Sequence, residues 1–375
     1  MTGLVAPLLG SVAAEFRDLT LRGPQGRFGL ATGLAVGAAV VLALALRLNQ
    51  PYWAGISAFM CSQATQPMSV AKALNRILGT VLGACATLFM YGFVAFDTAG
   101  MLLLLFTAAT LAVLGNLVSE HPYAWLLGGI TTVIVVLGAI DDPRIALAVG
   151  VLRIAEIVLG ALVAMVVANL LPKGVAVPAP VAPGWRSLLG DNWYMLNHGL
   201  RTGLAVALVP LVWQVLELPD LSQMGISVAA AMGVPALTGE PQRDSRLIAE
   251  RMAQRLIGCL LGGGFGLLVL ALPGSAMLGP WLLMLMAGIM VAAQIQSGRH
   301  KAAIVGTQAA IAMIITLVQG AQPAELLSPA IMRIAGMLGA LALLAIVGFV
   351  FGPGSQRQEP ARRVDGAGQG AQAWR

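Results

Sequence analysis

The chain carries a series of apolar segments, each near the roughly 20 residues that an α-helix needs to cross a bilayer core. They recur from Gly29 almost to Pro353. Charged residues make up only 10% of the chain, against roughly 25% in an ordinary soluble domain. A soluble fold of this length could not bury so much apolar surface. The sequence therefore predicts an all-α integral membrane protein.

The sequence also repeats itself once. The segment Gly29-Leu-Ala-Thr-Gly-Leu-Ala-Val36 returns 170 residues later as Gly199-Leu-Arg-Thr-Gly-Leu-Ala-Val206, and Arg76 matches Arg255 after 179 residues. Offsets that drift slowly in one order are the mark of a duplicated unit. We therefore expect two tandem repeats.

Each repeat divides into about six apolar spans. The first repeat is predicted to hold spans 29–46, 53–66, 74–93, 101–118, 124–140 and 145–171, and the second to hold 199–215, 224–237, 255–272, 280–295, 302–318 and 329–351. The second span of each repeat is short and ends near Pro67 or Pro235. Such a span is tilted, broken or only partly inserted, and the sequence leaves these alternatives open.

Orientation follows from the basic residues, which remain on the cytoplasmic side of short loops. With the N-terminus inside, that side collects most Lys and Arg residues, whereas the opposite loops hold mainly Asp and Glu. Both termini are then cytoplasmic. An even number of spans per repeat makes the repeats parallel, with a pseudo-two-fold axis along the membrane normal.

Five segments follow from this topology. They are a cytoplasmic N-terminal segment (1–27), a first six-helix repeat (28–172), a cytoplasmic linker (173–197), a second six-helix repeat (198–353) and a disordered cytoplasmic tail (354–375). Within the first of them, Leu4 to Leu21 are expected to form a short helix on the membrane surface.

Several classes of protein are disfavoured. The net charge of +6 would suit nucleic acid, but the basic residues are distributed by membrane side and form no single patch. Cys61, Cys85 and Cys259 lack the spacing of metal ligands, so neither a metal nor a cofactor is expected. The sequence contains no Walker A, H-E-x-x-H or G-x-S-x-G motif, and we do not expect an enzyme.

Charged side chains inside a bilayer are costly, so they are candidate functional residues. Arg153 and Glu156 fall within the sixth span, three residues apart on one helical face, and can pair. The residue matching Arg153 in the second repeat is Arg333. Two guanidinium groups facing a common axis would hold a carboxylate substrate, while Glu156 would exchange a proton. The structural alternative is an Arg153–Glu156 pair that locks helices together, with Arg333 extending to the membrane surface.

Two aromatic residues and two arginines are further candidates. Tyr52 and Trp53 lie at the predicted outer end of the second span, where they would anchor at the membrane interface or stack on an aromatic substrate. Arg76 and Arg255 are predicted to begin the third span of each repeat. They would act as positive-inside anchors or as an electrostatic entrance or gate.

His121 and His300 lie between the fourth and fifth spans of the two repeats. They are either solvated histidines or gate residues that change charge near neutral pH. The spans also contain amides, which would supply donors to a polar lumen or bond between helices. These are Asn116, Gln294, Gln296 and Gln308.

One string of motifs resembles a known family. Pro51-Tyr-Trp53, then Gln66-Pro67, then Arg76-Ile-Leu-Gly-Thr-Val-Leu-Gly83 is similar to the fusaric acid resistance (FUSC) family, also called the aromatic acid exporter family. The resemblance implies export of aromatic or other weak carboxylic acids across the bacterial inner membrane, driven by the proton gradient. It also implies a periplasmic adaptor protein as a partner.

We therefore predict a proton-coupled efflux carrier for small organic anions, with the lipid bilayer and the anion as its partners. The resemblance extends to plant malate channels built from a six-span unit, so a passive anion channel is the first alternative. A membrane scaffold without transport activity is the second.

Overall fold

The computed structural model describes residues 2–173, 182–190, 192–216, 241–272 and 277–319, with single residues between 331 and 347. Every element in this part of the chain is helical. Up to the linker the α-helices are α1 (Thr2–Arg17), α2 (Gly23–Ala45), α3 (Tyr52–Cys61), α4 (Gln66–Val94), α5 (Thr98–Val118), α6 (Pro122–Gly138) and α7 (Ala146–Val167). Beyond it are α8 (Trp193–Leu216), α10 (Pro241–Ala271), α11 (Leu278–Gln296) and α12 (Ala303–Leu317). Short 3-10 helices, Pro143–Ile145, Ala168–Leu170 and Trp185–Leu189, flank α7 and precede α8. The all-α prediction is confirmed for the described residues.

Seven of the described helices are long and apolar enough to cross a membrane. Most predicted spans coincide with a helix, although span 224–237 and most of span 329–351 lie outside the described residues. Four predicted starts were too late, because α2 begins at Gly23, α4 at Gln66, α8 at Trp193 and α10 at Pro241. Helices α2 and α4 each have a proline in the first turn, where the missing N–H costs nothing. Pro67 therefore starts α4 and does not close the preceding span.

The short second span of the first repeat is a broken segment. Helix α3 has 10 residues, about 15 Å of helix, which is half of a bilayer core. The residues before and after α3 both form hydrogen bonds, one with α7 and the other with the segment that follows α7. The Gln50 N–H donates to Glu156, half way along α7, and the Gln66 N–H donates to the Pro172 carbonyl. Non-helical backbone of this kind is tolerated in membrane proteins where it lines a polar cavity.

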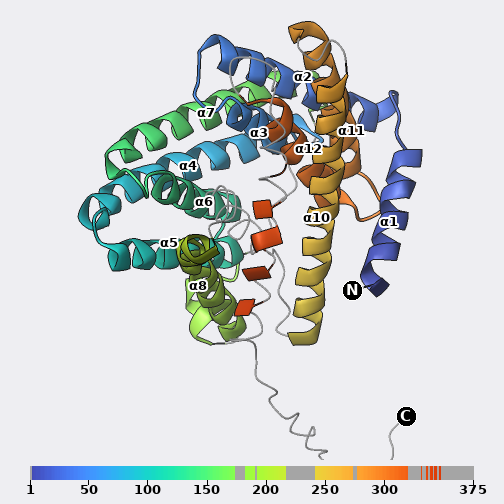
Figure 1. Ribbon diagram of the computed structural model, residues 1–375. Helices are drawn as coiled ribbons and strands as arrows, with labels where there is room; N and C mark the ends of the chain where they lie inside the picture. The colour runs from blue at the N-terminus through green and yellow to red at the C-terminus, as the bar shows by residue number, and fades with distance from the viewer. Residues whose placement is uncertain are drawn as a thin grey trace, which may run out of the picture.

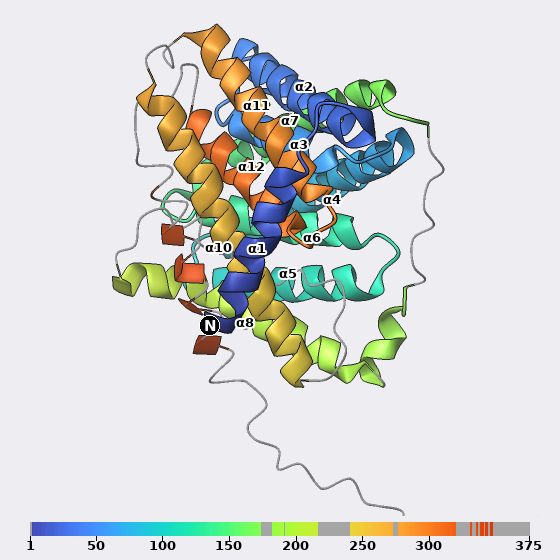
Figure 2. The same cartoon turned by 90° about the vertical axis from the view of Figure 1, so that its right-hand side faces the viewer.

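The helices form two connected rows (Figures 1 and 2). In the first row, neighbours in space follow the order α2, α7, α4, α6, α5 and α8. In the second row, α2 contacts α11, α11 contacts α12, and α12 packs along α10. Helix α3 lies against α2, α7 and α12. The largest apolar cluster joins α2 and α3 to α11 and α12, and contains Phe59 and Trp281.

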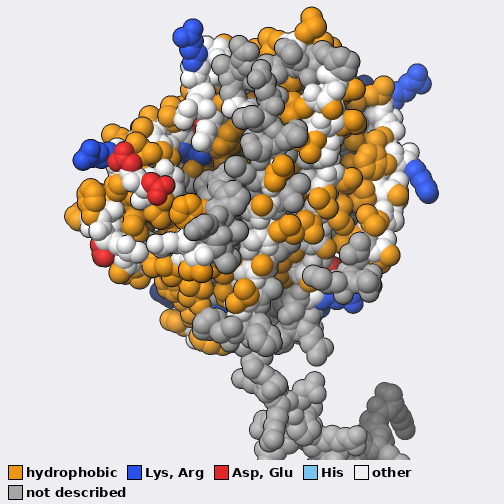
Figure 3. All heavy atoms as spheres, viewed as in Figure 1, with side chains coloured by type: hydrophobic (Ala, Val, Ile, Leu, Met, Phe, Trp, Pro, Cys, Tyr) orange, Lys and Arg blue, Asp and Glu red, His pale blue; other side chains and the backbone are white. Residues whose placement is uncertain are grey.

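Helix α4 is polar inside and apolar outside. Its buried face includes Arg76, Thr80 and Thr87, whereas large apolar side chains on the opposite face are exposed. These are Leu74, Leu78, Leu82, Phe89 and Phe93. Apolar side chains also cover much of the surface in Figure 3, with basic groups at its edges. A soluble helix has the reverse distribution, so this face is suited to contact with lipid.

Small residues allow close contact between helices in both repeats. A Cβ atom added at Gly79 or Gly83 would collide with the backbone of α6, and one at Gly258 or Gly262 would collide with that of α12. Each G-x-x-x-G pair thus places two small residues on one helical face and allows close contact. The pairs bring α4 against α6 and α10 against α12.

The N-terminal segment forms a docked helix. Helix α1 contacts α10 and α11, and its Glu15 is only 1% exposed. The Glu15 carboxylate accepts the backbone N–H of His300, and Asp18 Oδ2 lies 3.0 Å from His300 Nε2. The acidic end of α1 is therefore attached to the loop between α11 and α12.

Replacing Glu15 with alanine should release this end of α1. The change removes a carboxylate acceptor and leaves a buried N–H unsatisfied, which costs about 1.5–3 kcal/mol. We expect amide hydrogen exchange in α1 to speed up by about tenfold or more. Glu120→Ala, at an exposed position, is the control. Equal exchange in the two variants would show that the Glu15 contact does not hold α1.

Candidate anion-binding site

A cavity of about 180 Å³ lies between α3, α4, α6, α7, α10 and α12. Most of its wall is apolar, with six isoleucines among the lining residues. Its polar groups come from both repeats: Arg76, Tyr123 and Thr131 from the first, and Arg255, Thr307 and Gln308 from the second. The described lining contains two arginines and no carboxylate. An apolar pocket with a few convergent cationic groups suits a small organic anion.

Arg76 is a buried residue, 4% exposed, and the eleventh residue of α4. Its Nε–H donates to Ser57 Oγ on α3 at 2.9 Å, and Nη1 donates to the Tyr123 hydroxyl on α6 at 2.6 Å. Among the described residues it forms no ion pair with a carboxylate. The prediction that Arg76 begins a span was wrong, because α4 starts more than two turns earlier.

Arg255 was misplaced for the same reason. Helix α10 begins at Pro241, so Arg255 lies well inside the helix and reaches the same cavity as Arg76. These two residues match each other in the sequence repeat. One turn before Arg76, the Lys72 Nζ lies 5.3 Å from the centre of the Tyr123 ring. Two cationic groups thus line the cavity, and a third lies next to one of its lining residues.

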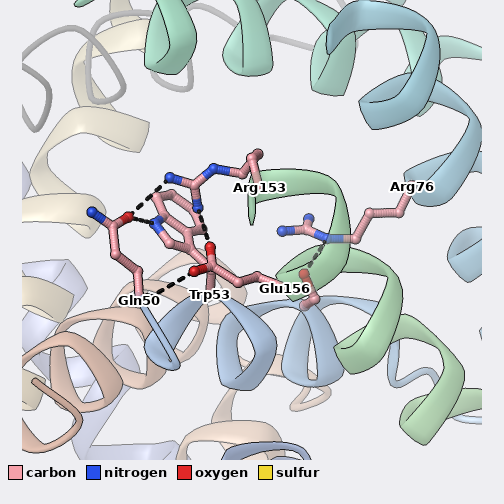
Figure 4. A network of polar contacts seen from close by, with 6 residues as sticks. Gln50, Trp53, Arg76, Arg153 and Glu156 are labelled. Carbon is pink, nitrogen blue, oxygen red and sulfur yellow. Dashed lines mark hydrogen bonds and ion pairs between the residues drawn. The ribbon is translucent and has the colours of Figure 1, made fainter. Parts of the chain in front are cut away.

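Arg153 and Glu156 form a second polar network, shown in Figure 4. The predicted pair is confirmed, with Arg153 Nη1 at 3.5 Å from Glu156 Oε2. Arg153 Nη2 donates to Gln50 Oε1 at 3.2 Å, and its guanidinium carbon lies 3.9 Å from the centre of the Trp53 ring. Gln50 also accepts the Trp53 indole N–H at 3.1 Å and donates its backbone N–H to Glu156 at 2.7 Å.

This network borders a separate cavity of about 270 Å³. Arg153, Glu156 and Gln50 line it, together with Asn49 and apolar residues of α7. Asn49 is exposed. Both charges are nearly buried, with side chains 4% and 2% exposed. A buried ion pair needs further hydrogen bonds to offset its desolvation, and Gln50 supplies them.

Trp53 belongs both to the network around Arg153 and to the cavity that holds Arg76 and Arg255. It is 7% exposed, stacks on Arg153, and also lines the cavity that contains Arg76 and Arg255. Trp53 thus has little exposed surface with which to anchor the chain at a membrane interface. Tyr52 is half-buried against the apolar cluster of α2 and α3, with its ring centre 5.5 Å from that of Trp53.

The two predicted histidines lie away from these cavities. His121 is exposed and precedes α6, while His300 contacts Glu15 and Asp18 of the N-terminal segment. Neither histidine lines the cavity shared by Arg76 and Arg255. Arg333 lies outside the described residues. No group of three or more potential metal ligands occurs in the part of the chain that the structure describes.

Three contributors were missed by sequence reasoning. Gln50 joins Arg153, Trp53 and Glu156, while Ser57 and Tyr123 position Arg76. The signals available were weak: Gln50 directly precedes the Pro-Tyr-Trp motif, and Ser57 belongs to the repeated Gly-Ile-Ser triplet. Apart from Trp53, three residues after Gln50, their partners are separated from them by 19 to 106 residues, which local patterns cannot predict.

The helices, the exposed apolar faces and the cationic cavity define a multi-pass α-helical membrane protein. The family model described as "Fusaric acid resistance protein family" matches residues 25–179. Over that segment the chain is similar to this family, and the resemblance inferred from the sequence is confirmed. No solved structure matches the chain at a significant level.

Curated relatives come from bacteria. The p-hydroxybenzoic acid efflux pump subunit AaeB of Edwardsiella ictaluri is 32% identical over 161 residues, which cover 40% of this chain and 25% of the relative. The uncharacterized transporter YdhK of Salmonella typhimurium is 29% identical over 155 residues, covering 40% and 22%. This chain thus spans about a quarter of the length of these relatives. The comparisons support a multi-pass bacterial membrane protein.

Proposed function

We propose that this protein exports small aromatic or other weak carboxylic acids, driven by the proton gradient. The observation that carries the proposal is the single cavity that holds Arg76 and Arg255 within an apolar wall. A guanidinium group binds a carboxylate through two parallel N–H bonds. The apolar remainder, with Trp53 and Tyr123, would accommodate the flat body of an aromatic acid. The names of the relatives, an efflux pump subunit and a transporter, support this function.

The carboxylate is placed at Arg76 and Arg255 in this proposal, and not at Arg153 and Arg333. The Arg153 guanidinium already contacts Glu156, Gln50 and Trp53, so part of its binding capacity is used. Arg76 retains donors beyond its two hydrogen bonds, because a guanidinium carries five. Glu156 keeps its proposed role in proton coupling, since a nearly buried carboxyl group beside a second cavity can exchange protons.

We also propose that the two halves are parallel repeats of about six helices around a pseudo-two-fold axis along the membrane normal. Reciprocal contacts support this arrangement. Helix α2, first in its repeat, packs on α11, and α8, first in the other, packs on α5. Gly29 and Gly33 approach Met290 and Met286, while Gly199 and Gly203 approach residues 106–114 of α5. Under this arrangement Arg76 and Arg255 are equivalent positions.

The protein would lie in the bacterial inner membrane with both termini in the cytoplasm, as the distribution of basic residues predicts. Lys72, Arg76 and Arg255 would then draw anions from the cytoplasm towards the cavity. The word "subunit" in the name of the first relative supports a partner, for which we propose a periplasmic adaptor protein.

Uptake into proteoliposomes tests this function. The purified full chain should accumulate labelled benzoate against its concentration gradient when the lumen is more acidic than the medium, and an uncoupler should abolish that accumulation. In protein-free liposomes this pH difference drives benzoic acid out of the lumen. A passive channel would retain downhill flux in the uncoupler and would never accumulate benzoate. Flux equal to that of protein-free liposomes would contradict transport and favour a scaffold.

A further inference from the structure

The Trp53 side chain connects two cavities of this protein. Neither the family match nor the relatives assign a role to Trp53. Trp53 contributes to the wall of the cavity that holds Arg76 and Arg255. The same side chain stacks on Arg153, which lines the cavity that holds Glu156. We propose that Trp53, positioned by Gln50, couples the protonation of Glu156 to the affinity of the neighbouring cavity for a carboxylate. This inference rests on the proposed function, because it needs an anion at Arg76 and Arg255.

Gln50 is the residue through which the coupling would pass. Its backbone N–H donates to Glu156 at 2.7 Å, while its side-chain oxygen accepts from both Trp53 and Arg153. The four side chains of Gln50, Trp53, Arg153 and Glu156 face one another in Figure 4. Arg76 reaches in from a separate helix on the same side of α3, further along it, and is bonded to Ser57. A change at Glu156 therefore reaches Trp53 through two routes, by way of Gln50 and by way of Arg153.

The segment that would move is not a regular helix. Residues 46–51 lie between α2 and α3. The N–H groups of residues 46–48 bond back to the last turn of α2, whereas the Gln50 N–H is held by the Glu156 carboxylate. Arg47 adopts a φ of 51°, which is a strained backbone conformation for a residue other than glycine. A segment held in place by a few side-chain contacts responds when one of them weakens.

The direction of the effect follows from the charge on Glu156. An ionised carboxylate attracts Arg153 and accepts the Gln50 N–H strongly, because charge-assisted hydrogen bonds are the stronger ones. Both attractions weaken when the carboxyl group takes up a proton. Trp53 is then less firmly held, and the wall that completes the anion cavity is lost. Binding of the proton and binding of the anion thus oppose each other, as exchange of a proton for an anion requires, and this linkage is reciprocal.

Direct electrostatics predicts the opposite sign. Protonation of Glu156 removes a negative charge from the neighbourhood of Arg153 on α7 and, further away, Tyr52 on α3 and Arg76 on α4. Without movement of Trp53, a carboxylate would therefore bind more tightly at low pH. The sign of the pH dependence separates a moving wall from a simple change in potential.

The experiment measures equilibrium binding of labelled benzoate to the purified full chain at about pH 6 and about pH 8, where benzoate itself stays ionised. For the unmodified protein we expect the Kd at the lower pH to be about tenfold weaker, a shift of about 1.4 kcal/mol. Glu156→Gln, which imitates the protonated form, should bind weakly at both pH values. Trp53→Leu and Gln50→Leu should lose the weakening at low pH or reverse it.

Trp53→Phe keeps an aromatic ring over Arg153 without the indole N–H, and should retain part of the pH dependence even if Trp53→Leu does not fold. The inference is overturned if the unmodified protein binds benzoate equally or more tightly at the lower pH. It is also overturned if Trp53→Phe and Gln50→Leu both keep the full pH dependence. Either result contradicts the coupling but leaves the proposal that Arg76 and Arg255 bind the anion unaffected. If the unmodified protein does not bind benzoate at all, the proposed function fails, and the coupling fails with it.

Discussion

Replacing Arg76 and Arg255 together with glutamine will reduce benzoate binding to the background level. Each guanidinium contributes a charge-assisted hydrogen bond to the bound carboxylate, worth about 1.5–3 kcal/mol. Loss of one such bond weakens Kd by about tenfold to a hundredfold, so the two single variants should be strongly impaired and the double variant should not bind measurably. Equilibrium binding to the purified protein measures both effects.

Two further variants separate charge from general damage. Arg76→Lys keeps the positive charge but loses the planar fork of donors, so its affinity should lie between those of the unmodified protein and Arg76→Gln. Arg144→Gln changes an exposed arginine outside the cavity and should bind benzoate normally. If folded Arg76→Gln bound benzoate with full affinity, the anion could not bind in this cavity through Arg76.

The buried Arg76 side chain in this cavity needs a negative charge close to it. Burying a cation without a counter-charge is unfavourable by several kcal/mol, and Arg76 forms no ion pair with a carboxylate in the part of the chain that is described. The Ser57 and Tyr123 oxygens satisfy its N–H groups but carry no full negative charge. A bound carboxylate would supply that charge. The same argument does not apply to Arg153, which has Glu156 beside it.

A leucine at Gly83 will separate α4 from α6 and destabilise the first repeat. A Cβ atom at Gly83 would already collide with the backbone of Gly128, and the rest of the leucine side chain needs still more space. Because the obstacle is backbone rather than a flexible side chain, we expect a cost near the upper end of overpacking effects, about 3 kcal/mol. Thermal unfolding in detergent, followed by the loss of monodisperse protein, measures it.

Gly92→Leu is the matched control for this variant. Gly92 lies on the same helix, and a Cβ atom there would meet nothing within 4 Å. Its replacement by leucine should leave the unfolding temperature unchanged or raise it slightly, since leucine is the better helix former. If Gly83→Leu and Gly92→Leu behaved alike, close contact between α4 and α6 would not be a condition for folding.

Much of this protein could be predicted from local patterns. The length of the apolar runs predicts spanning helices, because a bilayer core has a set thickness and a helix a set rise per residue. The pairing of Arg153 with Glu156 follows from a spacing of three residues on one helix. The close contacts at Gly79 and Gly83 likewise follow from small residues one turn apart. Each of these properties depends only on residues near one another in the chain.

The site depends on contacts that no local pattern contains. Arg76 and Arg255 are 179 residues apart in the sequence, and they line one cavity only because α4 and α10 both face α3, α6 and α12 there. Trp53 is buried because the first turn of α3 packs against the middle of α7. The sequence by itself thus determined the membrane class and the helices. Only the tertiary structure decided which charges meet, because that depends on how distant helices pack.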